Sequence, residues 1–217
     1  DRGRLEDALA SCQRALRLQP GSANTYNTQG NVYAALKQYT AALDSYDRAI
    51  AQQPDYPTAH YNRGNALLQI KKFPAAIASY DKAIAGKPDY HQAFDNRGIA
   101  FKEVGQMRKA IADHERAISI KPDYVQAHYN RALALCEVKE LSSAVSSFEA
   151  ALAIQADYPF LLGSYLHAKM QLCDWAGLKA SLEHLYALVD KGIAAVSPFV
   201  VTGLMDDPIL HKRVAAL

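Results

Sequence analysis

The fold of this 217-residue chain is decided by residues 23–56, ANTYNTQGNVYAALKQYTAALDSYDRAIAQQPDY. The pattern of this stretch recurs at a spacing of 34 residues, without an insertion, in residues 57–90, 91–124 and 125–158. The recurring positions hold mainly small residues and a proline, namely Gly30, Ala42, Ala49 and Pro54; Gly64, Ala76, Ala83 and Pro88; Gly98, Ala110, Ala117 and Pro122; and Ala132, Ala144, Ala151 and Ala156. A fixed period of this length predicts a solenoid, in which each unit packs only against its neighbours.

Each unit is predicted to form two antiparallel helices. In its first half, a bulky residue, a glycine and a second bulky residue follow one another at spacings of four and three, as in Tyr26, Gly30 and Tyr33, which places them on one side of a helix. Rings that lie over small residues allow two helices to approach closely. Proline cannot donate a helical hydrogen bond, so it ends the second helix. We expect the aspartates that follow to cap the next helix: Asp55, Asp89, Asp123 and Asp157.

These units resemble the tetratricopeptide repeat over roughly residues 3–158. The resemblance implies an all-α fold, a right-handed superhelix in which the first helix of each pair lines the concave face and the second faces outward. Residues 1–22 match only the second helix of a repeat, so we expect a truncated unit with an unknown number of further repeats upstream. Residues 159–217 depart from the period and are predicted to form a helical cap, or linker towards a catalytic region that is absent here.

The segment after the repeats carries a second resemblance. We expect an apolar helix over residues 159–171, a helix capped by Asp174 that ends at Gly192, and a last helix that begins at Asp206-Asp207-Pro208. The segment resembles the join between repeats and catalytic region in O-GlcNAc-transferase-like glycosyltransferases, a family that includes the SPINDLY type. The resemblance is carried by His167-Ala168-Lys169, Leu172-Cys173-Asp174-Trp175, Pro198-Phe199 and Asp206-Asp207-Pro208. It implies a docking arm for protein substrates or adaptors without an active site, so no catalytic residue is assigned.

Composition excludes several classes of function. The 24 basic and 22 acidic residues are well mixed and give a net charge of +2, which argues against a nucleic-acid partner. No apolar run approaches the ~18 residues that span a bilayer, so we expect no membrane segment. Three cysteines without CxxC spacing predict reduced thiols and a cytoplasmic location. The histidines lack a ligand spacing, so neither a metal nor another cofactor is predicted.

Asparagines at one position per repeat are predicted to line the concave face. Asn62, Asn96 and Asn130 occupy equivalent places in three consecutive units. A carboxamide both donates and accepts, so a row of them can hold the backbone of an extended protein or peptide ligand. An asparagine in a helix lowers helix stability by ~0.6 kcal/mol relative to alanine, which argues against asparagines that have no function. The predicted face also includes Asn31, Asn65, Tyr61, Asp95 and Tyr129. The alternative is that exposed helices tolerate asparagine and that copied repeats copy it.

Arginines and histidines recur as regularly. Arg63, Arg97 and Arg131 are predicted to pack their stems between helices and to pair with acids on the neighbouring helix, such as Asp81 or Glu115. A basic stripe for acidic ligands is the alternative. His60, His114 and His128 stand in aromatic positions of the repeat and are predicted to be packed residues.

Three hypotheses of function remain open at this stage. The first is the substrate- or partner-docking arm of a glycosyltransferase of the family above. The second is a free-standing repeat scaffold, such as an adaptor or assembly factor. The third is a catalytic domain, which would require clustered acid, base or nucleophile residues that the sequence does not present. The sequence does not name the partner, and apolar strips at both ends leave self-association and oligomeric state open.

Overall fold

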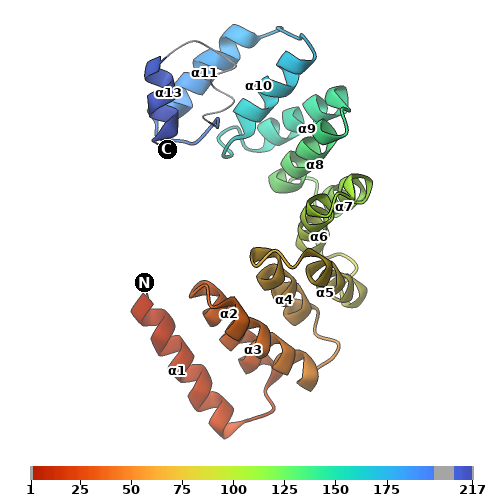
Figure 1. Ribbon diagram of the computed structural model, residues 1–217, viewed down its shortest axis with the longest axis vertical. Helices are drawn as coiled ribbons and strands as arrows, with labels where there is room; N and C mark the ends of the chain where they lie inside the picture. Colours follow the sequence, from red (N-terminus) through yellow and green to blue (C-terminus); the bar gives the residue numbers. More distant parts are fainter. Residues whose placement is uncertain (1, 198–207, 217) are drawn as a thin grey trace. The chain divides into compact units, whose positions relative to one another are not determined.

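The computed structural model describes residues 2–197 and 208–216, and every regular element within them is a helix (Figure 1). The helices are α1 (Arg2–Leu18), α2 (Ala23–Ala35), α3 (Tyr39–Gln52), α4 (Pro57–Gln69), α5 (Phe73–Gly86), α6 (His91–Glu103), α7 (Met107–Ile120), α8 (Val125–Glu137), α9 (Leu141–Ile154), α10 (Leu161–Gln171), α11 (Leu178–Asp190) and α13 (Pro208–Ala215). The chain divides into two compact units, Asp1–Asp113 (unit 1) and His114–Leu217 (unit 2).

Unit 1 is built of helix pairs that stack in chain order. Within it α2 packs on α3 and α4 on α5, while α3 packs on α4 and α5 on α6. This nearest-neighbour packing confirms the predicted solenoid of helix pairs. The recurring alanines of the second helices, Ala42, Ala49, Ala76 and Ala83, are completely buried. Because their side chains are small, the neighbouring helices lie close together.

The predicted contact of glycine with a ring is confirmed in both complete repeats of unit 1. Gly30 lies against the Tyr46 ring and Gly64 against the Tyr80 ring. A Cβ atom added at Gly64 would lie 2.5 Å from Cε1 of Tyr80, well inside van der Waals contact. Tyr46 and Tyr80 are 2% and 0% exposed. Glycine is therefore required by close approach of a ring, since these residues are helical and need no unusual backbone conformation.

The predicted aspartate caps are wrong. The residues that precede α4, α6 and α8 are Tyr56, Tyr90 and Tyr124, and none of them makes a side-chain cap hydrogen bond. The aspartate lies one residue earlier, inside a turn that the backbone closes: Tyr90 N–H donates to Lys87 O at 3.1 Å. The turn therefore sets the helix start one residue later than the capping rule expects. Helix α2 does have a side-chain cap, in which Thr25 N–H donates to Ser22 Oγ at 3.3 Å.

Unit 2 contains the pair α8 and α9, followed by a helical cap that does not follow the repeat. Helix α10 packs on α9 as a further first helix would. The cap has its own core, in which α10, α11, the segment around Val196 and α13 meet through Leu162, Leu166, Leu185, Leu188, Val189, Ala195, Val196, Leu210 and Val214. A Cβ atom at Gly163 would lie 2.5 Å from Cγ2 of Val196, so glycine lets this segment cross α10.

Three predictions for the C-terminal helical segment, residues 159–217, had different outcomes. Helix α11 ends at Asp190 and the left-handed Gly192 follows (φ 75°), close to the predicted end. Asp174 does not cap α11, whose preceding residue is Gly177; its carboxylate instead accepts from Ala176 N–H at 2.9 Å and closes a turn. Pro208 begins α13 as predicted, whereas Pro198-Phe199 and Asp206-Asp207 lie outside the described residues.

Candidate inner-face binding site

Three of the predicted site residues surround one cavity in unit 1. The cavity measures about 290 Å3 and lies between α2, α3 and α4; it is lined by Asn31, Ala34, Tyr39, Tyr46, Asn62, Asn65, Ala66 and Gln69. We call this the inner cavity. Its lining contains no charged side chain. Carboxamides and tyrosines supply its polar groups, which suits an uncharged ligand such as peptide backbone.

Two of the asparagines are oriented by buried tyrosines. Tyr46 Oη donates to Asn31 Oδ1 at 2.9 Å, and Tyr80 Oη donates to Asn65 Oδ1 at 2.8 Å. Burial raises the pKa of Tyr46 to about 12, so its hydroxyl keeps the proton that it donates. Because the tyrosine occupies the carbonyl side of Asn31, the NH2 group remains as the donor for a ligand.

Other asparagines join the first helices of successive repeats. Asn62 Nδ2 donates to Asn27 Oδ1 at 3.0 Å, which links α4 to α2. Asn96 Nδ2 donates to Asn65 Oδ1 at 2.8 Å and to Tyr61 Oη at 3.2 Å, which links α6 to α4. These bonds use the amide nitrogen and leave the carbonyl oxygens of Asn62 and Asn96 as acceptors. The asparagine row is therefore also a structural element between repeats, a role that sequence reasoning missed.

The sequence did contain a signal for the tyrosine-to-asparagine bond. Asn31 and Asn65 occur in the repeats whose second helix carries a tyrosine, Tyr46 or Tyr80. The next two repeats have Ile99 with His114 and Leu133 with Phe148 at the equivalent places. Where the ring lacks a phenolic hydroxyl, the asparagine is replaced by an apolar residue.

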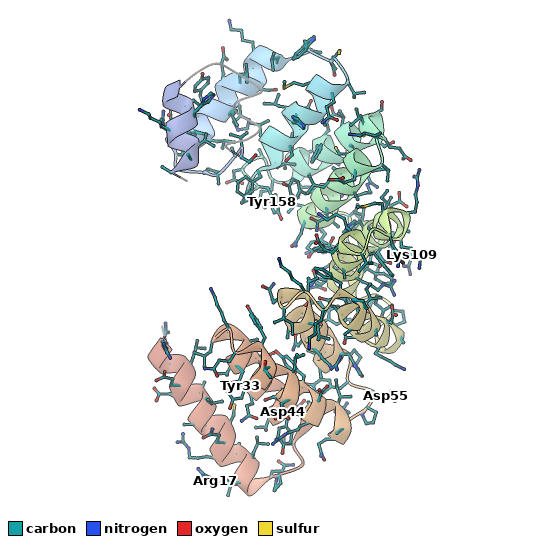
Figure 2. All side chains as sticks on the ribbon, viewed as in Figure 1. Arg17, Tyr33, Asp44, Asp55, Lys109 and Tyr158 are labelled. Carbon is teal, nitrogen blue, oxygen red and sulfur yellow. The ribbon has the colours of Figure 1, made fainter. Side chains whose placement is uncertain are left out.

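The remaining predicted site residues differ in accessibility. Tyr61 is partly buried and packs against Tyr90, with ring centroids 4.7 Å apart. Asp95 is completely buried, so the expectation that it borders an accessible face is not met. In unit 2, Asn130 and Tyr129 are partly buried, and Tyr129 packs against Tyr158 (labelled in Figure 2) with centroids 5.5 Å apart. The accessible predicted face thus consists of the asparagines and of tyrosine edges.

Two of the three arginines, Arg63 and Arg97, form the predicted ion pairs between helices. Arg97 binds Asp81 of the preceding second helix at 2.6 Å and Asp113 of its own pair at 2.7 Å. Arg63 binds Asp47 at 2.6 Å and donates to Ser79 at 2.8 Å. Arg131 donates to Ser147 Oγ at 3.1 Å, so its second-helix partner is a hydroxyl rather than an acid. Guanidinium groups held in this way are not a free basic stripe for acidic ligands.

The histidines are packed, and two of them bind the repeat turn. His114 is 1% exposed. His60 Nε2 and His128 Nε2 lie 2.9 and 2.8 Å from the carbonyl oxygens of Pro54 and Pro122, respectively. No group of three or more His, Cys, Asp or Glu side chains with a metal-binding arrangement occurs within residues 2–197 and 208–216. None of the helices described is long and apolar enough to cross a membrane.

Two stretches of the chain match models of the tetratricopeptide repeat, residues 27–91 and residues 101–138. No curated protein sequence matches the chain. Among solved structures, a crystal structure of MamA is 27% identical, covers 71% of this chain and 90% of its own, and has a TM-score of 0.67. YrrB, described as a TPR protein with an unusual peptide-binding site, is 17% identical, covers 95% of this chain and 98% of its own, and also has a TM-score of 0.67.

A third similar structure contains a ligand. The first TPR of Spaghetti (RPAP3), bound to the HSP90 peptide SRMEEVD, is 25% identical, covers 54% of this chain and 94% of its own, and has a TM-score of 0.54. Together with the stacked helix pairs, these matches identify the fold as a tetratricopeptide-repeat solenoid.

Proposed function

We propose that this chain is a protein-interaction scaffold that holds an extended segment of another protein on the face formed by its first helices. The observation that carries this proposal is the inner cavity, in which Asn31, Asn62 and Asn65 converge without a charged neighbour. The solved RPAP3 repeat with its bound HSP90 peptide supports peptide binding by this kind of fold. We propose that the chain acts by binding rather than by catalysis.

The hydrogen bonds around the inner cavity set what it offers a ligand. The Tyr46 hydroxyl occupies the carbonyl oxygen of Asn31, so the NH2 group of Asn31 remains as a donor for the ligand. The NH2 group of Asn62 is bound to Asn27, so the carbonyl oxygen of Asn62 remains as an acceptor. An extended backbone presents N–H and C=O groups that match such a pair. The inner cavity therefore binds peptide backbone without requiring charged side chains in the ligand. We propose the same role for Asn96 in unit 1 and for Asn130 and Tyr129 in unit 2.

The test is a peptide selected against this chain from a random display library, titrated calorimetrically with variants. Asn62→Ala removes the proposed ligand contact and the bond to Asn27. Asn27→Ala is the matched control, because it removes the same bond between repeats and leaves the Asn62 side chain in place. One lost hydrogen bond corresponds to ~0.5–1.5 kcal/mol, or roughly twofold to tenfold in Kd.

We expect Asn62→Ala to weaken binding by that factor and Asn27→Ala to leave the Kd nearly unchanged. The combined variant Asn62→Ala, Asn96→Ala and Asn130→Ala should lose more. Equal Kd values for Asn62→Ala and the parent protein, with both folded by circular dichroism, would remove the inner cavity as the binding site.

We further propose that the scaffold is the docking arm of an O-GlcNAc-transferase-like glycosyltransferase and works in the cytoplasm. The resemblance of residues 159–217 supports this association. The test is the coding sequence downstream of Leu217. Continuation into alternating strands and helices with a nucleotide-sugar site supports the docking arm, whereas a stop codon supports the alternative, a free-standing adaptor.

A further inference from the structure

The inner cavity contains polar groups that the proposed contacts with peptide backbone do not use. Helix α4 contributes Asn62, Asn65, Ala66 and Gln69 to its lining, at spacings that place them on one side of the helix over two turns. Asn62, the proposed acceptor for the backbone, lies at one end of this row, and Gln69 lies at the other. The part of the cavity around Asn65 and Gln69 is therefore available to a side chain of the bound segment.

Asn65 is held in one orientation by two hydrogen bonds to the same atom. Its Oδ1 accepts from the Tyr80 hydroxyl at 2.8 Å and from Asn96 Nδ2 at 2.8 Å. Burial raises the pKa of Tyr80 well above its ordinary value, so the donated proton stays on the tyrosine. A carbonyl oxygen has two lone pairs, and both are used here. The NH2 group of Asn65 therefore remains as a donor for a ligand.

Gln69 supplies an acceptor next to this donor. It lies one turn after Asn65 on α4, is exposed, and makes no hydrogen bond with any described residue. Side chains one turn apart have Cβ atoms roughly 5–6 Å from each other, so one group of a ligand can contact both. The group that matches them has an acceptor and a donor side by side, which is the arrangement in a carboxamide.

The rest of the lining fits one uncharged side chain. Ala34, Ala66 and Tyr39 form walls against which methylene groups can pack. The volume of about 290 Å3 lies just below the ≈ 300–1,000 Å3 of pockets for whole small molecules, which suits a single side chain. None of the lining residues is charged, so a carboxylate or an ammonium group would enter without an opposite charge, which is unfavourable.

We infer that the inner cavity binds the side-chain carboxamide of a glutamine or asparagine in the partner segment, an inference that rests on the proposed function. The ligand carbonyl accepts from Asn65 Nδ2, and the ligand NH2 group donates to Gln69 Oε1. Asn31 and Asn62 hold the backbone on either side. The cavity thus adds selection of one side chain to the binding of backbone.

The pair of carboxamides is particular to the second repeat. The position of Gln69 is held by Ala35, Glu103 and Glu137 in the other three, and that of Asn65 by Asn31, Ile99 and Leu133. Ala35 ends α2 as Gln69 ends α4. Alanine is thus compatible with this helix position, and Gln69→Ala is a suitable test variant.

The experiment is NMR titration of the isotope-labelled chain with three blocked peptides, acetyl-Ala-Ala-Xaa-Ala-Ala-amide, in which Xaa is Gln, Glu or Ala. All three offer the same backbone and differ only in the central side chain. We expect the Gln peptide to bind about fivefold or more tightly than the Ala peptide, because it adds two hydrogen bonds. It should bind roughly twofold to tenfold more tightly than the Glu peptide, which cannot donate to Gln69.

Variants of the chain locate the contact. Gln69→Ala should weaken binding of the Gln peptide roughly twofold to tenfold and leave the affinity for the Ala peptide unchanged. Gln52→Ala is the matched control, because Gln52 is also an exposed glutamine at the end of a helix, α3, but does not line the cavity. This control should bind all three peptides as the parent does.

The inference is overturned by equal affinity for the Gln and Ala peptides, by equal affinity for the Gln and Glu peptides, or by unchanged affinity of Gln69→Ala for the Gln peptide. If all three peptides shift the side-chain amides of Asn31 and Asn62 with equal affinity, carboxamide selection fails and the proposed backbone binding stands. If no peptide gives a saturable shift in the inner cavity at millimolar concentration, both fail.

Discussion

Replacing Gly64 by alanine tests the packing that defines the repeat. A Cβ atom would lie 2.5 Å from Cε1, 2.8 Å from Cδ1 and 2.9 Å from Cζ of Tyr80. Carbon atoms in contact normally lie ≈ 3.5–4.0 Å apart, so the ring must move by about 1 Å. Tyr80 is completely buried, and its hydroxyl is bound to Asn65 at 2.8 Å. The ring therefore cannot move without straining the surrounding helices or that hydrogen bond.

The expected change in the free energy of unfolding of Gly64→Ala is the sum of two losses and one gain. Overpacking of a core costs ~1–3 kcal/mol, and loss of the tyrosine hydrogen bond costs ~0.5–1.5 kcal/mol. Replacing glycine within a helix contributes about 1 kcal/mol in the other direction. We expect Gly64→Ala to lower the free energy of unfolding by ~1–3 kcal/mol, or several degrees in Tm. Urea and thermal denaturation followed by circular dichroism measure this loss.

A second variant separates the clash from other effects. Tyr80→Ala removes the ring, so adding Gly64→Ala to it should cost little or stabilise the helix. The double-mutant cycle should show that the two changes are not additive. In the last repeat the equivalent positions hold Ala132 and Phe148, both completely buried, which shows that the position tolerates alanine when the local packing is adjusted. An unchanged or higher Tm for Gly64→Ala alone would refute the reasoning about close approach.

Three further predictions follow from the described contacts. Arg97→Met leaves the nearly buried Asp113 without its ion pair and should cost ~2–4 kcal/mol in urea denaturation, whereas a loss below 0.5 kcal/mol would contradict the pairing. Burial raises the pKa of Tyr46 to about 12, above its ordinary value of 10. Between these pH values the folded chain therefore binds more protons than the unfolded chain, and the free energy of unfolding should fall as pH rises. Tyr46→Phe should lessen that fall in urea denaturation measured across this pH range. Asn65→Leu leaves the buried Tyr80 hydroxyl without its acceptor and should lower the free energy of unfolding by ~1–3 kcal/mol. Adding Tyr80→Phe should restore part of this loss, because the bond from Asn96 to Asn65 is also removed. No gain at all in thermal melts would show that the tyrosine hydrogen bond is not a cause.

The sequence determined the repeat, because the period of small and bulky residues is a local pattern. Gly64 and Tyr80 lie 16 residues apart, and their contact follows from helix periodicity and antiparallel pairing alone. The same logic predicted that the recurring arginines pair with acids of the neighbouring helix such as Asp81, which Arg97 does. The capping prediction failed at the turn between repeats. There, backbone hydrogen bonds such as Tyr90 N–H to Lys87 O set the start of the next helix, so the aspartate lies one residue before the capping position.

Only the tertiary structure decided how the asparagines are used. The sequence placed Asn62 and Asn96 on one row, but their bonds to Asn27, Asn65 and Tyr61 depend on how far each repeat is rotated on the one before. Periodicity fixes which side of a helix a residue occupies. The distance between side chains of adjacent repeats is set by packing, because the rings and alanines between the helices determine how closely the repeats approach.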